Sequence, residues 1–266
     1  MLCVVDHRFR KHFAPGNQIF IVIYALLLAT LTYRTESLSM SSSKSPVYSK
    51  KLINSPSGVV PDAVEGLLLT DSRLRRVSNL NIVVRSDIES AKEKYVSLIS
   101  GGGAGHEPAH AGFVGEGMLS AAVFGNVFAS PSVSAILAAI RICAGPKGVL
   151  LIVKNYTGDR LNFGMAMEKA KQEKIDVRMV IVDDDCALPV GKGITGGRGV
   201  AGTVFVHKVA GASAAEGRSL EEVHAEATSA VSLIGTLGIA LSTCTLPGAP
   251  SSLRLAGPRT YEVMRF

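Results

Sequence analysis

A histidine follows a run of glycines in residues 100–110, whose sequence is Ser-Gly-Gly-Gly-Ala-Gly-His-Glu-Pro-Ala-His. Four glycines in five positions let the backbone bend sharply and let a ligand lie against its N–H groups. His106 can then take up or release a proton near neutral pH. A flexible linker is the simpler interpretation of a glycine run. However, residues 95–99 read as a buried strand, and a strand followed by a polar loop is typical of a ligand site.

A second group of polar residues begins at Lys154, which ends an apolar run, and includes Asp159 after Asn-Tyr-Thr-Gly. In an open α/β sheet, ligands gather at the carboxyl ends of strands, and His106 and Asp159 both lie just past such ends. If the two strands are neighbours, a base, a carboxylate and an ammonium group meet in one crevice. The alternative is a surface salt bridge in a turn, which contributes little to stability.

A base of this kind can take a proton from a ligand's hydroxyl group, and the ammonium and carboxylate groups can fix the ligand's oxygen atoms. The three groups therefore suit a small polar ligand that gains or loses a proton. His106, Lys154 and Asp159 are candidates for these functions. The remaining histidines of this part of the chain are more typical of packed or surface residues, and we expect them to be structural: His110, His207 and His224.

Two further motifs point to other chemistry. The three aspartates at residues 183–185 could bind magnesium, because clustered carboxylates favour hard cations. A solvated strand end with a helix-capping aspartate is the simpler interpretation, so no metal site is expected. Residues 191–196 fit the GxGxxG pattern of a dinucleotide-binding oxidoreductase, which stays as an alternative function. That match is weak because it trails its strand by several residues, and the sequence has no GxxxxGK[ST] loop.

The longest motifs resemble those of one family. Residues 101–110, with Gly-Phe-Val-Gly-Glu-Gly-Met at 112–118, are similar to the substrate loop of the dihydroxyacetone kinases. Residues 154–159, followed by Asn162 and Phe163, resemble the second site loop of that family. Further similar segments lie at residues 50–54, 183–185 and 196–201. The resemblance extends over residues 50–248, and it is specific because two long, unusual motifs occur in the right order.

The resemblance implies a domain that binds dihydroxyacetone or glyceraldehyde for ATP-dependent phosphorylation. It assigns His106 as the acid or base beside the ketone and Asp159 as the base for the attacking hydroxyl. It implies these substrate-binding residues: Gly103, Ala104, Gly105, His106, Lys154 and Asp159. In the family, ATP and magnesium belong to a separate helical domain, so neither cofactor is expected on this chain. A homodimer, or pairing with a full-length kinase subunit, is the expected assembly.

One part of the family's pattern is missing from this sequence. The family holds its ketone covalently, through a histidine in a Gly-Ile-His-Gly-Glu-Pro-Gly motif that follows a Cys-Thr-Leu-Pro-Gly segment. That segment is present at residues 244–248, but no histidine occurs after His224. The resemblance therefore implies a C-terminally truncated ketone-binding domain, without the ATP-binding domain and inactive alone. A non-catalytic binding or regulatory fragment of the same fold is the second interpretation.

The apolar patterns predict strands and helices around these motifs. Strands are expected at residues 81–85, 95–100, 148–154, 178–182 and 239–243. Helices are expected within residues 52–72, from a Ser130 cap to Cys143, and at 162–174, 200–215 and 219–233. Ser219 and Glu222 have the spacing of a capping box. Strands that alternate with helices predict an α/β fold, a mostly parallel sheet with helices on both faces.

The net charge of +6 comes from the two ends of the chain. Residues 1–50 and 251–266 together carry nine basic and three acidic residues, whereas residues 51–250 carry 19 of each. A nucleic-acid-binding domain carries its basic patch on the fold, so nucleic acid is not an expected partner. The four cysteines lie far apart and lack zinc-site spacing, which favours reduced thiols in a cytoplasmic protein.

The first 49 residues differ from the rest and are predicted to be a leader or dispensable extension that packs poorly against the core. The apolar run at residues 19–31 is too short for a typical membrane span, so membrane association is not expected. It suits a signal-peptide core, and targeting by residues 1–35 is therefore the alternative to a cytoplasmic location. Residues 50–248 are the predicted N-terminal part of the substrate-binding domain, and residues 249–266 are an atypical tail.

Overall fold

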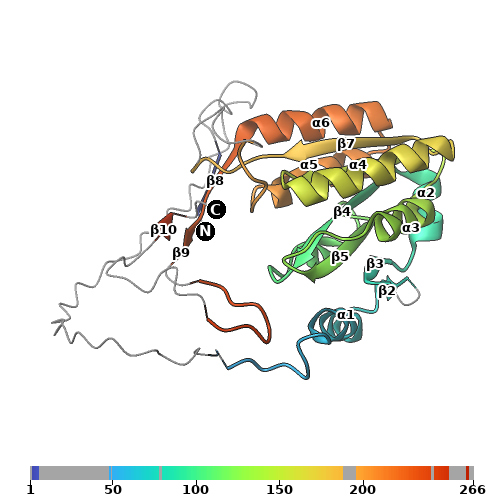
Figure 1. The fold of residues 1–266 in the computed structure, drawn as a ribbon. Coiled ribbons are helices and arrows are strands. Elements are labelled where there is room, and N and C mark those ends of the chain that lie inside the picture. The colour runs from blue at the N-terminus through green and yellow to red at the C-terminus, as the bar shows by residue number, and fades with distance from the viewer. Residues whose placement is uncertain are drawn as a thin grey trace, which may run out of the picture.

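The computed structural model describes residues 2–5, 48, 50–77, 80–187, 196–240, 243–251 and 262–263. Six strands form its central sheet: β2 (Leu74–Arg76), β3 (Ile82–Arg85), β4 (Ser97–Ala104), β5 (Ala121–Val127), β6 (Val149–Lys154) and β7 (Val177–Val182). They are arranged in the order β2-β3-β5-β4-β6-β7 (Figure 1). The four strands from β5 to β7 run parallel, and β2 and β3 add an antiparallel edge. The sheet is therefore mostly parallel, as predicted.

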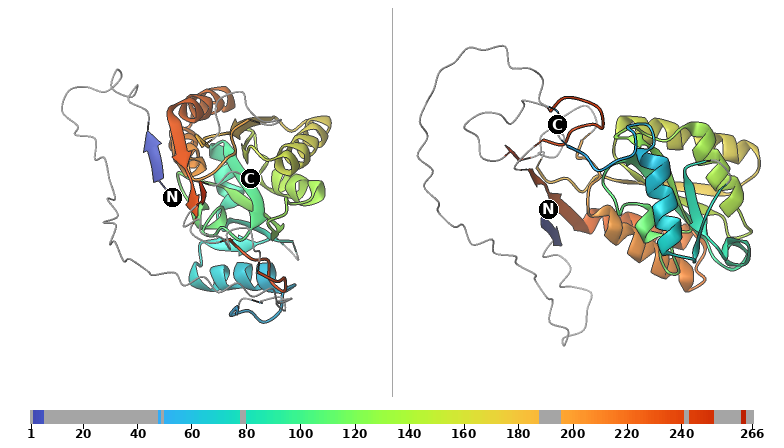
Figure 2. Two further views of the ribbon diagram at one scale, coloured as in Figure 1. Left: turned by 60° about the vertical axis from the view of Figure 1, so that its left-hand side comes forward. Right: turned by 90° about the horizontal axis from the view of Figure 1, so that it is seen from below.

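Helices cover both faces of this sheet, which confirms the predicted α/β fold. They are α1 (Val59–Thr70), α2 (Ile88–Lys94), α3 (Val133–Cys143), α4 (Thr157–Gln172), α5 (Thr203–Ala215) and α6 (Leu220–Leu233). Helices α3 and α4 lie on one face, and α5 and α6 lie on the other (Figure 2). All six residues of β6 are buried, as a strand covered on both sides requires.

Successive side chains of the central strands point to opposite faces and so build two separate hydrophobic cores. Leu98 and Ile152 pack with α5 and α6 in one core, whereas Ile99 and Leu151 pack with α3 and α4 in the other. Strands β4 and β6 are direct neighbours, with Ser97 opposite Val149 and Ser100 opposite Ile152. Because they are parallel, their carboxyl ends lie at the same edge of the sheet.

Most predicted elements are present, but several short elements were not predicted, among them β2, α2 and β8, and three further differences bear on the site. Strand β5 lies between β3 and β4 but was not predicted, because Ala121–Val127 contains small residues and a glycine rather than a β-branched run. Helix α3 is capped by Ser132, whose hydroxyl accepts a hydrogen bond from Ala135 N, and not by Ser130. Helix α4 begins at Thr157 instead of residue 162, which places Asp159 in its first turn. The capping box of Ser219 and Glu222 at the start of α6 is confirmed.

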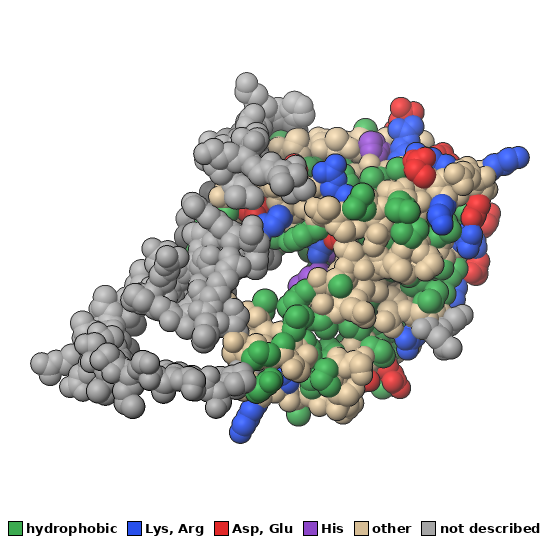
Figure 3. Space-filling model, in the orientation of Figure 1, with side chains coloured by type: hydrophobic (Ala, Val, Ile, Leu, Met, Phe, Trp, Pro, Cys, Tyr) green, Lys and Arg blue, Asp and Glu red, His purple; other side chains and the backbone are tan. Residues whose placement is uncertain are grey.

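Short antiparallel pairs lie outside the central sheet. Strand β1 (Leu2–Val5) pairs with β8 (Ile234–Leu237), and β10 (Glu262–Val263) pairs with β9 (Ile239–Ala240). Residues 19–31 lie outside the described residues, and so do residues 191–195 of the GxGxxG pattern. Among the helices that the structure describes, none has the length and apolar character needed to cross a bilayer. On the face shown in Figure 3, basic and acidic side chains are interspersed.

Candidate functional site

Three of the glycines that were predicted to form a loop belong to a strand. Strand β4 continues through Gly101, Gly102 and Gly103, and the chain turns only at Gly105, whose φ of 108° favours glycine. A side chain at Gly103 would collide with the backbone of Phe128 and Ala129. The glycine run therefore lets β4 pass very close to the backbone of residues 128 and 129. These glycines place no side chain of their own over the backbone of β4.

Lys154 ends β6 and reaches toward the turn that follows β4. Its side chain is buried, and its Nζ lies 2.8 Å from Nε2 of His106. Burial lowers the pKa of Lys154, while the nearby carboxylates of Asp159 and Asp184 oppose this shift. Burial of the imidazole and the Lys154 ammonium together lower the pKa of His106. At neutral pH His106 is therefore an uncharged base that faces an ammonium group.

Asp159 is held in the first turn of α4 and is only 3% exposed. Burial raises the pKa of its carboxyl group, whereas the Ser130 hydroxyl and Lys154 lower it. Its Oδ1 atom has no hydrogen-bond partner among the described residues. A buried carboxylate oxygen without a partner is costly, and a ligand hydroxyl placed there would satisfy it.

The strand end at Gly102 brings these groups together. A Cβ atom built on Gly102 would lie 3.4 Å from Nζ of Lys154 and 3.5 Å from Oδ2 of Asp159. Both polar groups therefore surround the same small space, which exists because residue 102 has no side chain. His106 joins them through its contact with Lys154. Lys154, Asp159 and His106 therefore lie near one another at the carboxyl edge of the sheet.

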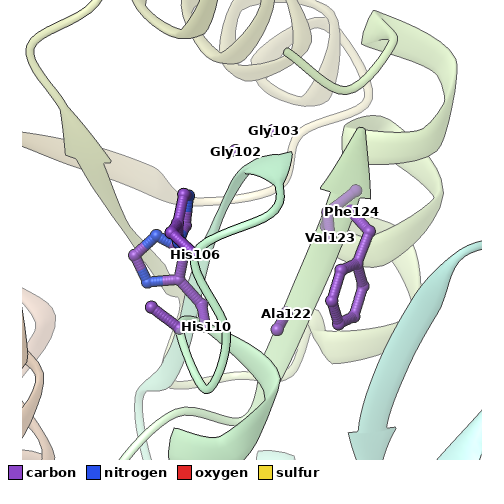
Figure 4. Close-up of a pocket in the computed structure, with 8 residues that line it drawn as sticks. Gly102, Gly103, His106, His110, Ala122, Val123 and Phe124 are labelled. Carbon is purple, nitrogen blue, oxygen red and sulfur yellow. The ribbon is translucent and has the colours of Figure 1, made fainter. Parts of the chain in front are cut away.

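Four of the predicted substrate-binding residues line two different concave surfaces, whereas Lys154 and Asp159 line neither of them. Gly103 and His106 line a small pocket together with Gly102, Ala109 and His110 (Figure 4). Ala104 and Gly105 instead line a wider cleft of about 390 Å³ with Glu107, Phe128 and Cys244, among others. The Gly105 N–H donates to the Glu107 carboxylate at 3.1 Å, so this donor is already used within the turn.

Ser130, which was predicted to cap α3, lies beside Asp159 instead. Its hydroxyl lies against the first turn of α4, 2.6 Å from where a Cβ on Gly158 would be, and it lowers the pKa of Asp159. Ser132, two residues later, supplies the helix cap instead. The Ser-Pro pair therefore lies just before α3, as predicted, but it does not cap the helix.

The other histidines are packed, as expected. His110 and His207 are buried and lie 2.9 Å apart, from Nδ1 to Nε2. Burial lowers both pKa values, and that of His207 falls to about 3. His224 on α6 has its Nε2 3.2 Å from the carbonyl of Met179.

The acidic run at residues 183–185 has an internal role. Asp184 accepts hydrogen bonds from the backbone N–H groups of Val200 and Gly202, both at 2.7 Å, just before α5. Asp185 accepts two hydrogen bonds from the guanidinium of Arg198, at 2.6 and 2.9 Å. Both carboxylates are buried, so the expectation of a solvated strand end was wrong for Asp184 and Asp185, whereas Asp183 is exposed. The expected helix-capping aspartate was also wrong, because the cap residue of α5 is Gly202 and no side chain caps this helix. The described part of the chain contains no group of three His, Cys, Asp or Glu residues that could hold a metal ion.

Comparison with known proteins places this architecture in one family. The model of the Dak1 domain matches residues 65–263. The chain is 58% identical over 218 residues to a 3,4-dihydroxy-2-butanone kinase-type protein of Solanum lycopersicum, covering 81% of this chain and 36% of that protein. It is 53% identical over 210 residues to the triokinase/FMN cyclase of Mus musculus, covering 78% and 36% respectively. The chain thus spans little more than a third of the length of these relatives.

Shorter relatives and solved structures agree with this placement. The dihydroxyacetone-binding subunit DhaK of a PTS-dependent kinase from Listeria innocua is 49% identical over 199 residues, covering 74% of this chain and 60% of that subunit. The crystal structure of the dihydroxyacetone kinase of C. freundii superposes with a TM-score of 0.72 at 48% identity, over 77% of this chain and 38% of that one. A dihydroxyacetone kinase operon co-activator, Dha-DhaQ, superposes with a TM-score of 0.67 at 41% identity, over 73% and 59%. The chain belongs to the Dak1 domain family, whose members include the dihydroxyacetone kinases and triokinases.

Proposed function

We propose that this chain binds dihydroxyacetone, or the isomeric glyceraldehyde, as the triose-binding part of a dihydroxyacetone kinase. The observation that supports this most strongly is the set of groups around Gly102. A buried ammonium and a buried carboxylate with an unpartnered oxygen lie beside a strand end that has no side chain. A three-carbon hydroxyketone presents a carbonyl oxygen and hydroxyl groups that match these donors and acceptors.

Each polar group has a distinct task in this proposal. Lys154 donates a hydrogen bond to a triose oxygen, and Oδ1 of Asp159 accepts one from the hydroxyl that is to be phosphorylated. Because burial raises its pKa, Asp159 is a stronger base than an exposed aspartate and is suited to take the hydroxyl proton. His106, an uncharged imidazole, assists as acid or base beside the carbonyl group.

ATP and magnesium are proposed to bind to another domain. The carboxylates of Asp184 and Asp185 are occupied by backbone N–H groups and by Arg198, and the described residues do not fit a magnesium ion. No step of phosphoryl transfer is therefore assigned to a nucleotide-binding residue of this chain. The 266-residue chain by itself is expected to bind the triose without phosphorylating it.

Calorimetric titration with dihydroxyacetone tests the proposal. Lys154→Met removes the buried ammonium and is expected to weaken binding by about 10- to 100-fold, the usual value of a hydrogen bond to a charged group. Lys169→Met, which removes an exposed lysine from the last turn of α4, is the matched control and should bind normally. Equal affinity of the Lys154→Met variant and the unmodified chain would rule out this site.

A regulatory fragment is the second candidate function, and the similarity to an operon co-activator favours it. Such a fragment would bind the triose but would not support its phosphorylation. Mixing the chain with ATP and a separate ATP-binding domain of the same family distinguishes the two. Turnover supports the kinase function, whereas triose binding without turnover supports the regulatory one.

A further inference from the structure

Two buried histidines from distant parts of the chain are hydrogen-bonded to each other behind the site. His110 Nδ1 lies 2.9 Å from Nε2 of His207, which is 97 residues away on α5. The Ser100 hydroxyl lies 3.3 Å from the same His110 nitrogen. The three side chains are buried, with exposures of 4% for His110 and 0% for the other two. None of them was among the predicted site residues.

The positions of the protons follow from the partners. The Ser100 hydroxyl lies 2.7 Å from the carbonyl of Ile152, which can only accept, so the hydroxyl proton points there. The hydroxyl oxygen then makes a hydrogen bond with His110 only if Nδ1 of His110 carries a proton. With that proton in place, Nε2 of His207 is the acceptor, and the proton of His207 is on Nδ1, an atom without a partner among the described residues. Nε2 of His110 is left as a buried lone pair without a partner among the described residues.

This pair reaches the site through the His106 ring. The rings of His106 and His110 meet edge to face, with centroids 5.7 Å apart and planes 83° apart (Figure 4). On its other side, His106 contacts Lys154. Both His106 and His110 line the small pocket. The orientation of His110 therefore limits where the His106 ring can lie.

We infer that His110 and His207 are positioning residues, a hydrogen-bonded pair that fixes the His110 ring and thereby holds Nε2 of His106 toward Lys154. Neither residue needs to touch the ligand. An acceptor at residue 207 is required, because without it the buried Nδ1–H of His110 keeps only the longer contact with Ser100. The inference deepens the proposed function, but its first test needs no ligand.

That test is ¹⁵N NMR of histidine-labelled chain at neutral pH, with two variants of residue 207. His207→Gln keeps an acceptor near the position of Nε2, whereas His207→Leu fills similar space without one. We expect a protonated Nδ1 and an unprotonated Nε2 for His110 in the unmodified chain and in His207→Gln. In His207→Leu, the His106 signals should change to those of a mixture of tautomers. A protonated Nε2 on His110, or unchanged His106 signals in His207→Leu, overturns the inference.

Titration with dihydroxyacetone then tests the consequence for the site. We expect His207→Leu to weaken binding about fivefold, a typical coupling between residues in contact, and His207→Gln to restore it. Equal weakening in both variants, with equal melting temperatures, would mean that the acceptor is not what matters and would contradict the inference. If the unmodified chain bound no triose, the proposed function would fail, while the tautomer measurement would still decide the role of the pair.

Discussion

At the scale of single residues, the site places two ionisable groups where water cannot stabilise their charges. Lys154 and Asp159 are both buried at the carboxyl edge of the sheet. Burial lowers the pKa of the lysine and raises that of the aspartate, so each charged form is less favoured here than in an exposed residue. Groups held in this way destabilise the fold and are typical of sites that bind or react.

Replacing Asp159 by asparagine should therefore stabilise the protein at neutral pH. A raised pKa in the folded state means that the protonated carboxyl stabilises the fold at low pH, and that this contribution is lost as the pH rises through the folded pKa. We expect Asp159→Asn to raise the melting temperature by about 2–4 °C at pH 7. The difference should shrink as the pH falls toward 4. A lower melting temperature at pH 7 would mean that the charged carboxylate stabilises the fold.

The site residues could be predicted from the sequence only where they directly follow a strand. His106, Lys154 and Asp159 come just after or at the ends of β4 and β6, and these strands have strong apolar patterns. The His110–His207 contact joins residues 97 positions apart, and no local pattern encodes it. Ser130 precedes a proline and a helix, a pattern that predicts a helix cap and gives no indication that the hydroxyl lies beside Asp159.

At the scale of elements, the strands with continuous apolar runs were predicted, whereas β5, which is rich in small residues, and the short strand β2 were not. Each residue of β6 is buried, and its sequence reads as a strand without further context. Strand β5 contains Gly125 and two alanines, and it becomes a strand through pairing with β3 and β4. Tertiary pairing decided its structure, which a single sequence does not reveal.

Substitutions of the two serines before α3 are expected to have different effects, one on helix stability and the other on ligand binding. Ser132→Ala removes the side chain that accepts from Ala135 N and is expected to reduce the free energy of unfolding by about 1 kcal/mol. Ser130→Ala should leave the stability nearly unchanged but weaken dihydroxyacetone binding, because the Ser130 hydroxyl faces Asp159. Urea unfolding and calorimetry measure the two effects. The opposite pattern would restore Ser130 as the cap.

The close passage of β4 predicts a strong effect of one added methyl group. Gly103→Ala would place its Cβ against the backbone of Phe128 and Ala129, and we expect it to reduce the free energy of unfolding by about 1–3 kcal/mol. Gly164→Ala in α4 is the control, since a Cβ there meets nothing within 4 Å. It should stabilise the helix by about 0.5–1 kcal/mol. Equal effects of both changes in urea unfolding would contradict the packing argument.

At the scale of the whole molecule, the sheet separates two cores and brings loops from distant segments to one edge. Lys154 and Asp159 come from β6 and α4, while His207 comes from α5 on the opposite face. The loop before α5 is fastened by Asp184 through the N–H groups of Val200 and Gly202. With the inferred role of His207, the proposed site depends on both layers of helices and not only on the segments that follow β4 and β6.

The 266-residue chain alone is predicted to phosphorylate no dihydroxyacetone. Its sequence has no GxxxxGK[ST] loop, and the carboxylates of Asp184 and Asp185 already accept hydrogen bonds from the backbone and from Arg198. Phosphoryl transfer from ATP, with and without an added ATP-binding domain of the family, measures this. Mass spectrometry of the chain after incubation with dihydroxyacetone checks for a covalent adduct, and none is expected. Turnover by the chain alone would show that it carries a nucleotide site of its own.

A triose is proposed to bind at the carboxyl ends of β4 and β6. A crystal structure of the chain soaked with dihydroxyacetone tests this proposal most directly. We predict a ligand whose oxygen atoms lie about 3 Å from Nζ of Lys154 and from Oδ1 of Asp159, a normal hydrogen-bond distance. Binding instead in the wider cleft beside Phe128 and Cys244, or no bound triose at saturating concentration, would contradict the account.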